Sequence, residues 1–210
     1  IFDHLTQLAA RTFGTPIALV SLVDAERQWF KSRVGLAATE TPREYAFCGW
    51  AIHDDVVFHV PDASQDPRFA DNPLVTGDPS IRFYAGAPLV VKGAGALGTL
   101  CVIGPEPRGF SPEERATLAD LAAIVTEALQ LRREALIAER QTKLLTAAEE
   151  LAAVGHWRRD FVNETLFWSD QVYRIHGLDP AAYTPKLDQA IEAYHPDDRE
   201  MVAEHVQRSV

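Results

Sequence analysis

The most reactive side chains in this sequence are two cysteine thiols, Cys48 and Cys101. They lie far apart along the chain and lack the close paired spacing that is typical of a zinc site. Two thiols can form a disulfide, act as nucleophiles or pack as small hydrophobic side chains. With two cysteines in the whole chain, we expect free thiols in a reducing compartment rather than a structural bridge.

Histidines and carboxylates gather at one further place. His53 and His59 flank Asp54 and Asp55, and these residue types bind transition metals. No third ligand has the right spacing, and a run of acids at a turn is usually solvated, so we expect no metal site. The sequence also lacks a Gly-Lys-Ser phosphate loop, a serine elbow and a pair of catalytic carboxylates. The residues alone therefore predict no catalytic centre.

The charge of the chain argues against two classes of partner. Its 20 basic residues face 30 acidic residues, which gives a net charge of −10. Nucleic acids and anionic membranes both attract basic surfaces, so we expect neither as a partner. No run of about 18 apolar residues and no signal peptide is visible, which predicts a cytoplasmic location without a membrane segment in this stretch. The first residue is isoleucine, as expected of a piece of a longer protein.

The first part of the sequence predicts a helix that leads into an antiparallel sheet. Apolar residues recur at helical spacing over residues 2–13, and Gly14 ends that helix before the β-branched run at 17–24. Residues 28–35 alternate in polarity, as the second strand of a hairpin does. We therefore expect residues 17–35 to form a strand pair next to the helix.

The next part mixes regular and irregular segments. Thr41 and Glu44 have the spacing of a capping box, which predicts a short helix over residues 47–52. The stretch 66–89, DPRFADNPLVTGDPSIRFYAGAPL, mixes charges, prolines and aromatic residues and then runs directly into a strand. Further strands are expected at 56–60, 83–91 and 96–104, joined by hairpins or by this one irregular crossover.

A single long helix is predicted after the sheet. Ser111 and Glu114 form a capping box, and residues 113–154 contain no glycine or proline. A helix over residues 111–153 is about 60 Å long at 1.5 Å per residue, which is more than one domain needs. Its apolar seam follows a heptad pattern with a stutter near Leu136, which favours a stalk between two chains over packing on its own domain. The expected dimer contacts are Leu118, Val125, Leu129, Leu136, Leu144 and Leu151.

A second, smaller module begins after Gly155. Two short strands are expected to turn at Asn163-Glu164, and Ser169 has the position of a helix cap, with Gly177 at the end of that helix. A lone hairpin is not stable by itself, so we expect these residues to be the opening part of a larger sheet domain. Further helix starts are expected at Thr184 and His195.

These elements together resemble two known families. Residues 1 to about 130 are similar to the GAF domain of bacterial sensor proteins, through FDHLTQLAARTFGTPIALVSLVDAERQWFKSRVG, FCGWAI, DPRFADNPLV to IRFYAGAPL, and LGTLCVI. The end of the chain, with GHWRRDF, LFWSDQVYRIHGLDP and HPDDRE, resembles the first half of a PAS domain of the PAS_3 kind. The resemblance implies an α+β fold with three parts. These are a GAF-like antiparallel sheet of five or six strands flanked by helices (1–115), a long signalling helix (111–153) and the N-terminal part of a PAS-like sheet domain (154–210).

In both families a sheet holds a small-molecule pocket under short helices and loops. The resemblance implies that residues 66–89 cover the sheet as a lid, in which Asp66, Asp71 and Asn72 bond irregular backbone. A ligand there is expected to be mostly apolar or planar; the alternative is that the aromatic side chains simply fill a core. The expected ligand-binding residues are Phe30, Phe47, Cys48, Trp50, Phe69, Asp71, Asn72, Phe83, Tyr84, Leu100 and Val102.

The cofactors of known GAF domains leave no motif here. Bilin-binding members carry a cysteine followed by histidine, whereas glycine follows Cys48 and valine follows Cys101. The Asn-Lys…Phe…Asp-Glu signature of cyclic-nucleotide-binding members is missing from the sequence. Haem needs an axial ligand, and the nearby histidines, His53 and His59, are expected on the surface or in loops. We therefore expect no bilin, haem or cyclic nucleotide.

The resemblance implies a regulatory sensor module of a signal-transduction protein. Such a module binds a small ligand, or acts as a homodimeric relay through the long helix, and controls an output domain in the same chain. We expect a histidine kinase as the output, with a cyclic-di-nucleotide enzyme as the other choice, and no catalysis within this stretch. Two alternatives stay open. One is a thiol-dependent reductase, because some small GAF proteins reduce methionine sulfoxide with clustered cysteines; the other is a dimerisation scaffold with a collapsed pocket.

Overall fold

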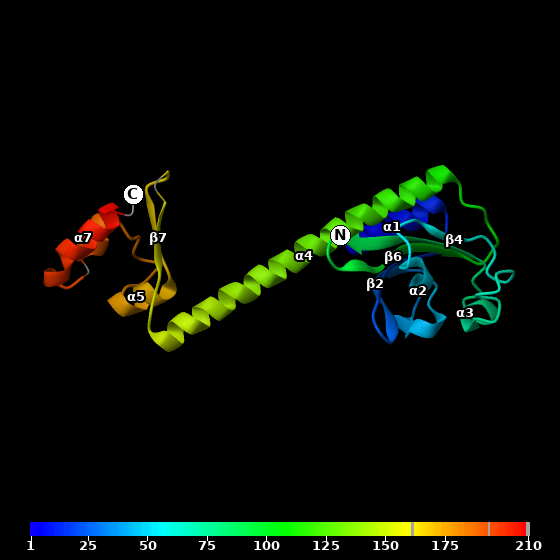
Figure 1. The fold of residues 1–210 in the computed structure, drawn as a ribbon, viewed down its shortest axis with the longest axis horizontal. Coiled ribbons are helices and arrows are strands. Elements are labelled where there is room, and N and C mark those ends of the chain that lie inside the picture. Colours follow the sequence, from blue (N-terminus) through cyan, green and yellow to red (C-terminus); the bar gives the residue numbers. More distant parts are fainter. Residues whose placement is uncertain (161, 193, 209–210) are drawn as a thin grey trace. The chain divides into compact units, whose positions relative to one another are not determined.

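The computed structural model describes residues 1–160, 162–192 and 194–208, which form two compact units (Figure 1). The first unit comprises Ile1–Glu134 and the second Ala135–Val210. One helix, α4 (Pro112–Ala152), contributes to both. Among the described residues, no helix is both long and apolar enough to cross a membrane.

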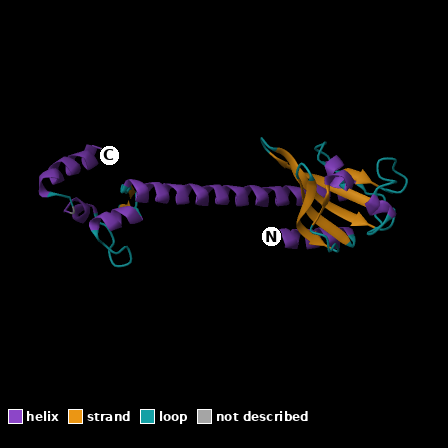
Figure 2. Ribbon diagram, turned by 90° about the horizontal axis from the view of Figure 1, so that it is seen from below, coloured by secondary structure: helices purple, strands orange, loops and turns teal. Residues whose placement is uncertain are grey.

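The first unit is built on a six-stranded antiparallel sheet, whose strands fan out side by side in Figure 2. The strand order is β3-β2-β1-β6-β5-β4. The expected fold class is therefore confirmed. The elements of this unit before α4 are α1 (Phe2–Phe13), β1 (Ile17–Val23), β2 (Arg27–Val34), β3 (Glu40–Pro42), the 3-10 turn η1 (Arg43–Tyr45), α2 (Phe47–Ala51), β4 (Phe58–Val60), α3 (Pro73–Thr76), β5 (Phe83–Val91) and β6 (Gly95–Gly104).

Local sequence signals explain most of these elements. Gly14 adopts a left-handed conformation at φ 61° and ends α1, as its position predicted. β1 and β2 form the expected hairpin, and the glycine-rich turn between β5 and β6 has Gly93 and Gly95 at positive φ. At α4 the backbone N–H of Glu114 donates to Ser111 Oγ at 3.2 Å, and that of Ser111 donates to the Glu114 carboxylate at 2.8 Å. This reciprocal pair is the predicted capping box.

The capping box predicted at Thr41 and Glu44 is wrong. Residues 40–42 instead form β3, an edge strand in which Thr41 pairs with Gln28 of β2. A proline is tolerated here because an edge strand has one side that needs no ladder bonds, so Pro42 ends β3 without disrupting the sheet. The helix α2 does form over Phe47–Ala51, but without a side-chain cap.

The two faces of this sheet are covered differently. The face that we call the helix face packs on α1 and the first turns of α4, which lie along the same side of the sheet in Figure 1. The face that we call the cavity face packs on α2 and on the crossover that leads to β5. The buried core at the helix face includes Phe13, Val20, Phe83, Leu100, Val102, Leu118 and Val125, which come from the sheet and from the helices that cover it. The buried core at the cavity face includes Leu19, Phe30, Phe47, Cys48, Phe69, Tyr84, Cys101 and Ile103, which come from the sheet, from α2 and from the crossover.

The course of α4 corrects part of the predicted dimer seam. Leu118 and Val125 are fully buried and Leu129 is partly buried, all in the core of the first unit. These three residues therefore serve the packing of their own domain, because a helix that packs on a sheet buries residues at nearly the same period as a coiled coil. Leu136, Leu144 and Leu151 are 55%, 62% and 91% exposed, so that only the later half of the predicted seam is free for a partner.

The second unit contains a hairpin of β7 (Trp157–Asp160) and β8 (Thr165–Trp168), with Glu164 in the predicted turn at φ 52°. Ser169 precedes α5 (Asp170–His176) as expected, but its hydroxyl accepts a hydrogen bond from the backbone N–H of His156 instead of capping the helix. Gly177 ends α5 in the left-handed conformation. The helix expected from Thr184 begins later, as α6 (Leu187–Glu192), and η2 (Pro196–Asp198) leads into α7 (Arg199–Arg208).

Candidate functional site

A cavity of about 180 Å³ lies between the cavity face and the segments that cover it. Apolar side chains of β1, β2, β5 and β6 form its floor, and Phe47 and Cys48 of α2 form one wall. The crossover supplies the cover through α3 and the loop after it. This is the place that the sequence assigns to the irregular segment 66–89. The floor residues are Ile17, Leu19, Phe30, Tyr84 and Ile103, and the cover residues are Leu74, Asp78, Pro79 and Ile81.

Two side-chain oxygen atoms at this cavity have no hydrogen-bond partner within the described part of the chain. Gln28 is 5% exposed, and its Oε1 has no partner among the described residues. The same holds for Oγ1 of Thr41, which is the cross-strand neighbour of Gln28 and also lines the cavity. A buried polar group without a partner costs about 1–3 kcal/mol, so native proteins satisfy nearly all of them. This end of the cavity is therefore a polar edge that a bound molecule would complete.

An irregularity in β2 decides which side chains of this strand face the cavity. Phe30 pairs with Ser21 and Ser32 with Val20, so that Lys31 is the additional residue of a β-bulge. Because of the bulge, Phe30 belongs to the cavity face, while Ser32 hydrogen-bonds to Thr6 of α1 at 2.9 Å on the helix face. Gln28 follows the alternation of Phe30 and also faces the cavity.

The two thiols lie together at the inner wall of the cavity. The sulfur atoms of Cys48 and Cys101 are 3.8 Å apart, both residues are buried, and both are free thiols. Thr99 Oγ1 and Tyr84 Oη also donate to Cys48 Sγ, at 3.0 Å and 3.2 Å. Of the two, Cys48 lines the cavity.

This environment separates the two thiols in acidity. Burial by itself raises the pKa of Cys48, but hydrogen bonds from Cys101, Thr99 and Tyr84 outweigh it and lower the pKa to about 7. The hydrogen bond to Cys48, together with burial, raises the pKa of Cys101 well above its usual value. Of the two thiols, Cys48 is therefore the one that more readily becomes a thiolate.

Four of the predicted ligand-binding residues line the cavity: Phe30, Phe47, Cys48 and Tyr84. Phe83, Leu100 and Val102 do not, because they lie on the helix face. Successive side chains of a strand point to opposite faces of the sheet, so that Phe83 faces away from the cavity if its neighbour Tyr84 faces into it. The same alternation brings Cys101 and Ile103 to the cavity face in place of Leu100 and Val102.

The other predicted site residues lie around the cavity rather than in it. Phe69 is buried and stacks on Phe47 at a centroid distance of 4.1 Å, so it supports the wall from behind. Trp50 is 49% exposed and contacts the edge of Phe69 from the surface. Asn72 caps α3 through the N–H of Leu74 and donates to the carbonyl of Tyr45, which fixes the crossover to the segment before α2.

The carboxylates of the crossover have local roles. Asp66 accepts from the backbone N–H of Arg68 and pairs with its guanidinium, as the prediction of a turn-stabilising acid requires. Hydrogen bonds from Arg68 also lower the pKa of Asp66. Asp71 is exposed at the surface and does not line the cavity.

Sequence reasoning missed Gln28, Thr41, Leu74 and Ile81 as cavity residues. Alternation in β2 was a usable signal for Gln28, because it has the same parity as Phe30. The role of Thr41 was hidden by the mistaken capping box, and the cover residues lie in an irregular segment whose side-chain directions follow no period.

The histidines near the crossover have structural contacts. His59 is half-buried, with Nε2 3.3 Å from the carbonyl of Arg108 and Nδ1 3.0 Å from the guanidinium of Arg115. Burial lowers its pKa. His53 is exposed on the surface. Within the described part of the chain, no three histidine, cysteine or acidic side chains gather closely enough to hold a metal ion.

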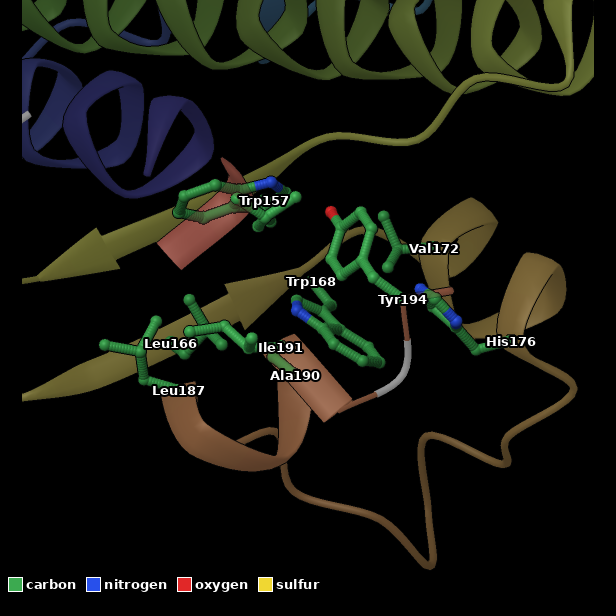
Figure 3. A pocket seen from close by; sticks show the side chains of 10 residues that line it. Trp157, Leu166, Trp168, Val172, His176, Leu187, Ala190, Ile191 and Tyr194 are labelled. Carbon is green, nitrogen blue, oxygen red and sulfur yellow. The ribbon is translucent and has the colours of Figure 1, made fainter. Parts of the chain in front are cut away.

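The second unit has a smaller pocket between its hairpin and the helices α5 and α6 (Figure 3). Its volume is about 20 Å³, which is room for roughly one water molecule. Trp168 stacks on His176 at a centroid distance of 5.0 Å, and both side chains line the pocket. The larger cavity of the first unit is therefore the better candidate site.

Comparisons with known proteins follow the same division of the chain. The family model of the GAF domain matches residues 1–129, and that of the PAS fold matches residues 165–210. A cyclic di-GMP phosphodiesterase of Pseudomonas aeruginosa is 44% identical over 145 residues, which is 69% of this chain and 25% of that protein. The chain thus matches about a quarter of the length of this relative.

Solved structures share the fold of the first unit. One is the GAF domain of an Acinetobacter phosphoenolpyruvate-protein phosphotransferase, with a TM-score of 0.54 and 19% identity. The match spans 63% of this chain and 82% of the Acinetobacter chain. Another is the free methionine-R-sulfoxide reductase of Neisseria meningitidis in complex with its substrate, with a TM-score of 0.53 and 20% identity. This match spans 64% of this chain and 78% of the Neisseria chain. These likenesses show the fold alone. The GAF family model matches residues 1–129, which is more than half of this chain, and the chain therefore belongs to the GAF domain family.

Proposed function

We propose that this chain is the sensory part of a signalling protein, and that its input is a small molecule bound in the cavity of the GAF domain. The observation that carries this proposal is the polar edge of Gln28 and Thr41 in an otherwise apolar cavity. A collapsed scaffold has no reason to keep unpaired polar atoms at the wall of an empty space, since their burial costs stability.

The output that fits this chain best is the hydrolysis of cyclic di-GMP. The 44% identical relative is a cyclic di-GMP phosphodiesterase, and its similarity extends over the sensory region. This relative favours a cyclic-di-nucleotide enzyme over the histidine kinase that the family resemblance suggested.

A path of contacts supports a relay from the crossover to α4. The backbone N–H of Arg108, just before α4, donates to the carbonyl of Pro61 at the start of the crossover. His59 of β4 contacts both Arg108 and Arg115, and Arg115 lies in the first turn of α4. A ligand that moves the crossover would therefore shift the start of α4, provided that it binds one arrangement more tightly than the other.

The end of α4 that belongs to the second unit is held there by side-chain contacts within that unit. Arg174 of α5 pairs with Glu150 at 2.6 Å, and His156, just before β7, contacts Glu149. Between the two ends, Leu136, Leu144 and Leu151 are exposed, which suits a helix pair in a homodimer. Sedimentation tests this part: a Leu144→Glu chain should dissociate at concentrations at which the unmodified chain is dimeric.

A chimera tests the sensory function. The GAF domain of this chain replaces the corresponding region of the Pseudomonas aeruginosa phosphodiesterase, and hydrolysis of cyclic di-GMP is measured with and without Ala46→Leu, which fills the cavity from its wall. Ala94→Leu, in the exposed turn between β5 and β6, is the matched control. We expect the cavity substitution to change the rate severalfold and the turn substitution to leave it unchanged. Equal rates in all three proteins would contradict the proposal.

A thiol-dependent reductase is the second candidate function. It is favoured by one observation, the 3.8 Å approach of Cys48 and Cys101 at the cavity. In such a reaction the sulfoxide oxygen leaves as water while the two thiols become a disulfide, which an external dithiol then reduces. Incubation of the chain with free methionine sulfoxide and dithiothreitol decides between the candidates. Turnover that is lost in Cys48→Ser would establish the reductase; the sensory proposal predicts no turnover.

A further inference from the structure

The polar and charged groups of the cavity limit what it can bind. Gln28 Oε1 is a buried acceptor without a partner, and Thr41 Oγ1, a hydroxyl that can accept or donate, is a second buried atom without one; the two residues are neighbours across β2 and β3. Among the described residues that line the cavity, the charged one is Asp78, a carboxylate in the cover. Lysine, arginine and histidine are missing from this lining set. The cavity thus offers an unpaired amide oxygen and a hydroxyl, and the lining that the structure describes carries no positive charge.

We infer that the cavity takes a neutral or cationic ligand of one or two rings that donates a hydrogen bond to the Gln28–Thr41 edge, and that anionic nucleotides are excluded. This inference deepens the proposed function, on which it rests for the role of the cavity. The remaining wall is apolar, with Ile17, Leu19, Phe30 and Ile103 against the body of the ligand.

The size of the cavity sets the upper bound on the ligand. A dry cavity of about 150 Å³ holds benzene in another protein, whereas drug-sized ligands need roughly 300 Å³ or more. A volume of about 180 Å³ therefore suits a molecule of one or two rings. A cyclic dinucleotide is several times larger and carries two phosphates, so the substrate of the proposed output would not be the ligand of the input.

Electrostatics disfavours anions at both ends of the cavity. Asp78 repels them at the exposed cover, although solvent screens this effect. At the inner wall, Cys48 is the more acidic of the two thiols, because hydrogen bonds that outweigh burial lower its pKa to about 7, and an anion beside it would oppose its ionisation. An anion would meet no compensating charge and would lose its hydration, which is costly in a site of low dielectric constant.

Four probes of equal ring size test the inference. Indole has an N–H donor, indene replaces it with CH₂, tryptamine adds a cationic amine, and indole-3-acetate adds an anion. Binding to the 210-residue chain is measured by calorimetry and by the shift of the melting temperature. We expect indole and tryptamine to bind at least tenfold more tightly than indene and indole-3-acetate, since loss of one hydrogen bond to a buried acceptor costs about that factor.

A substitution locates the donor contact. Gln28→Leu should bring the affinities of indole and indene within about twofold of each other. Gln7→Leu, at an exposed position of α1, should leave their ratio unchanged. Equal binding of indole and indene to the unmodified chain, tighter binding of indole-3-acetate or cyclic di-GMP, or no binding of any probe at millimolar concentration would each overturn the inference.

The chimeric phosphodiesterase separates this inference from the function on which it rests. If indole-type donors bind but hydrolysis does not respond to them or to filling of the cavity, the sensory function fails and the ligand class stands. If hydrolysis responds through the cavity to an anionic ligand, the sensory function stands and the ligand class fails.

Discussion

The two faces of the GAF sheet differ in whether the polar side chains of β2 that are buried there have hydrogen-bond partners. On the helix face, the Ser32 hydroxyl accepts from Thr6 and donates to Asp3, so that it has two partners in α1. On the cavity face, Gln28, which lies on the same strand, keeps an unpaired acceptor. The helix face is completed by the fold itself, whereas the cavity face keeps a buried acceptor that the fold leaves open. The proposed binding of a ligand on the cavity face would account for this contrast.

The largest expected effect concerns the helix face. Leu118 is fully buried between α4 and the sheet, so Leu118→Ala should lower the free energy of unfolding of the first unit by about 3 kcal/mol. Leu131→Ala, farther along the same helix at a position that is 60% exposed, should change it by less than about 0.5 kcal/mol. Urea unfolding of the two variants measures the difference. Similar losses would mean that the first turns of α4 do not belong to the core.

The next prediction compares how substitutions of two polar residues of β2, one on each face of the sheet, change the free energy of unfolding. Gln28→Leu removes a buried amide whose oxygen has no partner and should raise the free energy of unfolding of the ligand-free chain by about 1 kcal/mol. Ser32→Ala removes two hydrogen bonds on the helix face and should lower it by about 1–2 kcal/mol. Thermal or urea unfolding gives both signs. A loss of stability in both variants would show that Gln28 is satisfied in the free protein.

A smaller effect distinguishes the two thiols of the cavity face. Because the pKa of Cys48 is lowered to about 7, its thiolate fraction and its rate of alkylation by iodoacetamide should rise about tenfold between pH 6 and pH 8 and level off above. Cys101, whose pKa is raised, should stay unreactive over this range. Peptide mass spectrometry of the labelled chain follows each residue.

The control for the thiol is Thr99→Val, which removes a hydrogen bond to Cys48 without opening the site. The rise in alkylation should then move to higher pH, because the thiolate loses a donor. A rate for the unmodified chain that continues to climb to pH 9 would contradict the lowered pKa.

Much of the fold follows from local sequence signals. α1, the first hairpin, β5 and the capping box of α4 each carry a period or a cap that tertiary contacts do not override, and they form where the sequence predicts. One exception is β3, because Thr41 and Glu44 match a capping box equally well until the neighbouring strand β2 is in place. Local propensity is ambiguous where a segment depends on a partner.

The candidate site was less predictable for two physical reasons. Assigning Phe83, Leu100 and Val102 to the pocket required a choice between the two faces of strands that are apolar on both sides, and the sequence carries no sign of which face holds the cavity. The unpaired state of Gln28 and Thr41 is a tertiary property, since it depends on what does not reach them. The early leucines of α4 were mistaken for dimer contacts because packing on a sheet and packing in a coiled coil have nearly the same period.

The measurement that tests the central claim most directly is a titration of the ¹⁵N-labelled 210-residue chain with indole, followed by two-dimensional NMR. The account predicts progressive shifts for the amides of Phe30, Thr41, Leu74 and Ile103 around the cavity, and constant positions for those of Leu5, Phe13 and Leu118 on the helix face. Shifts confined to the helix face, or no shifts at saturating indole, would contradict it.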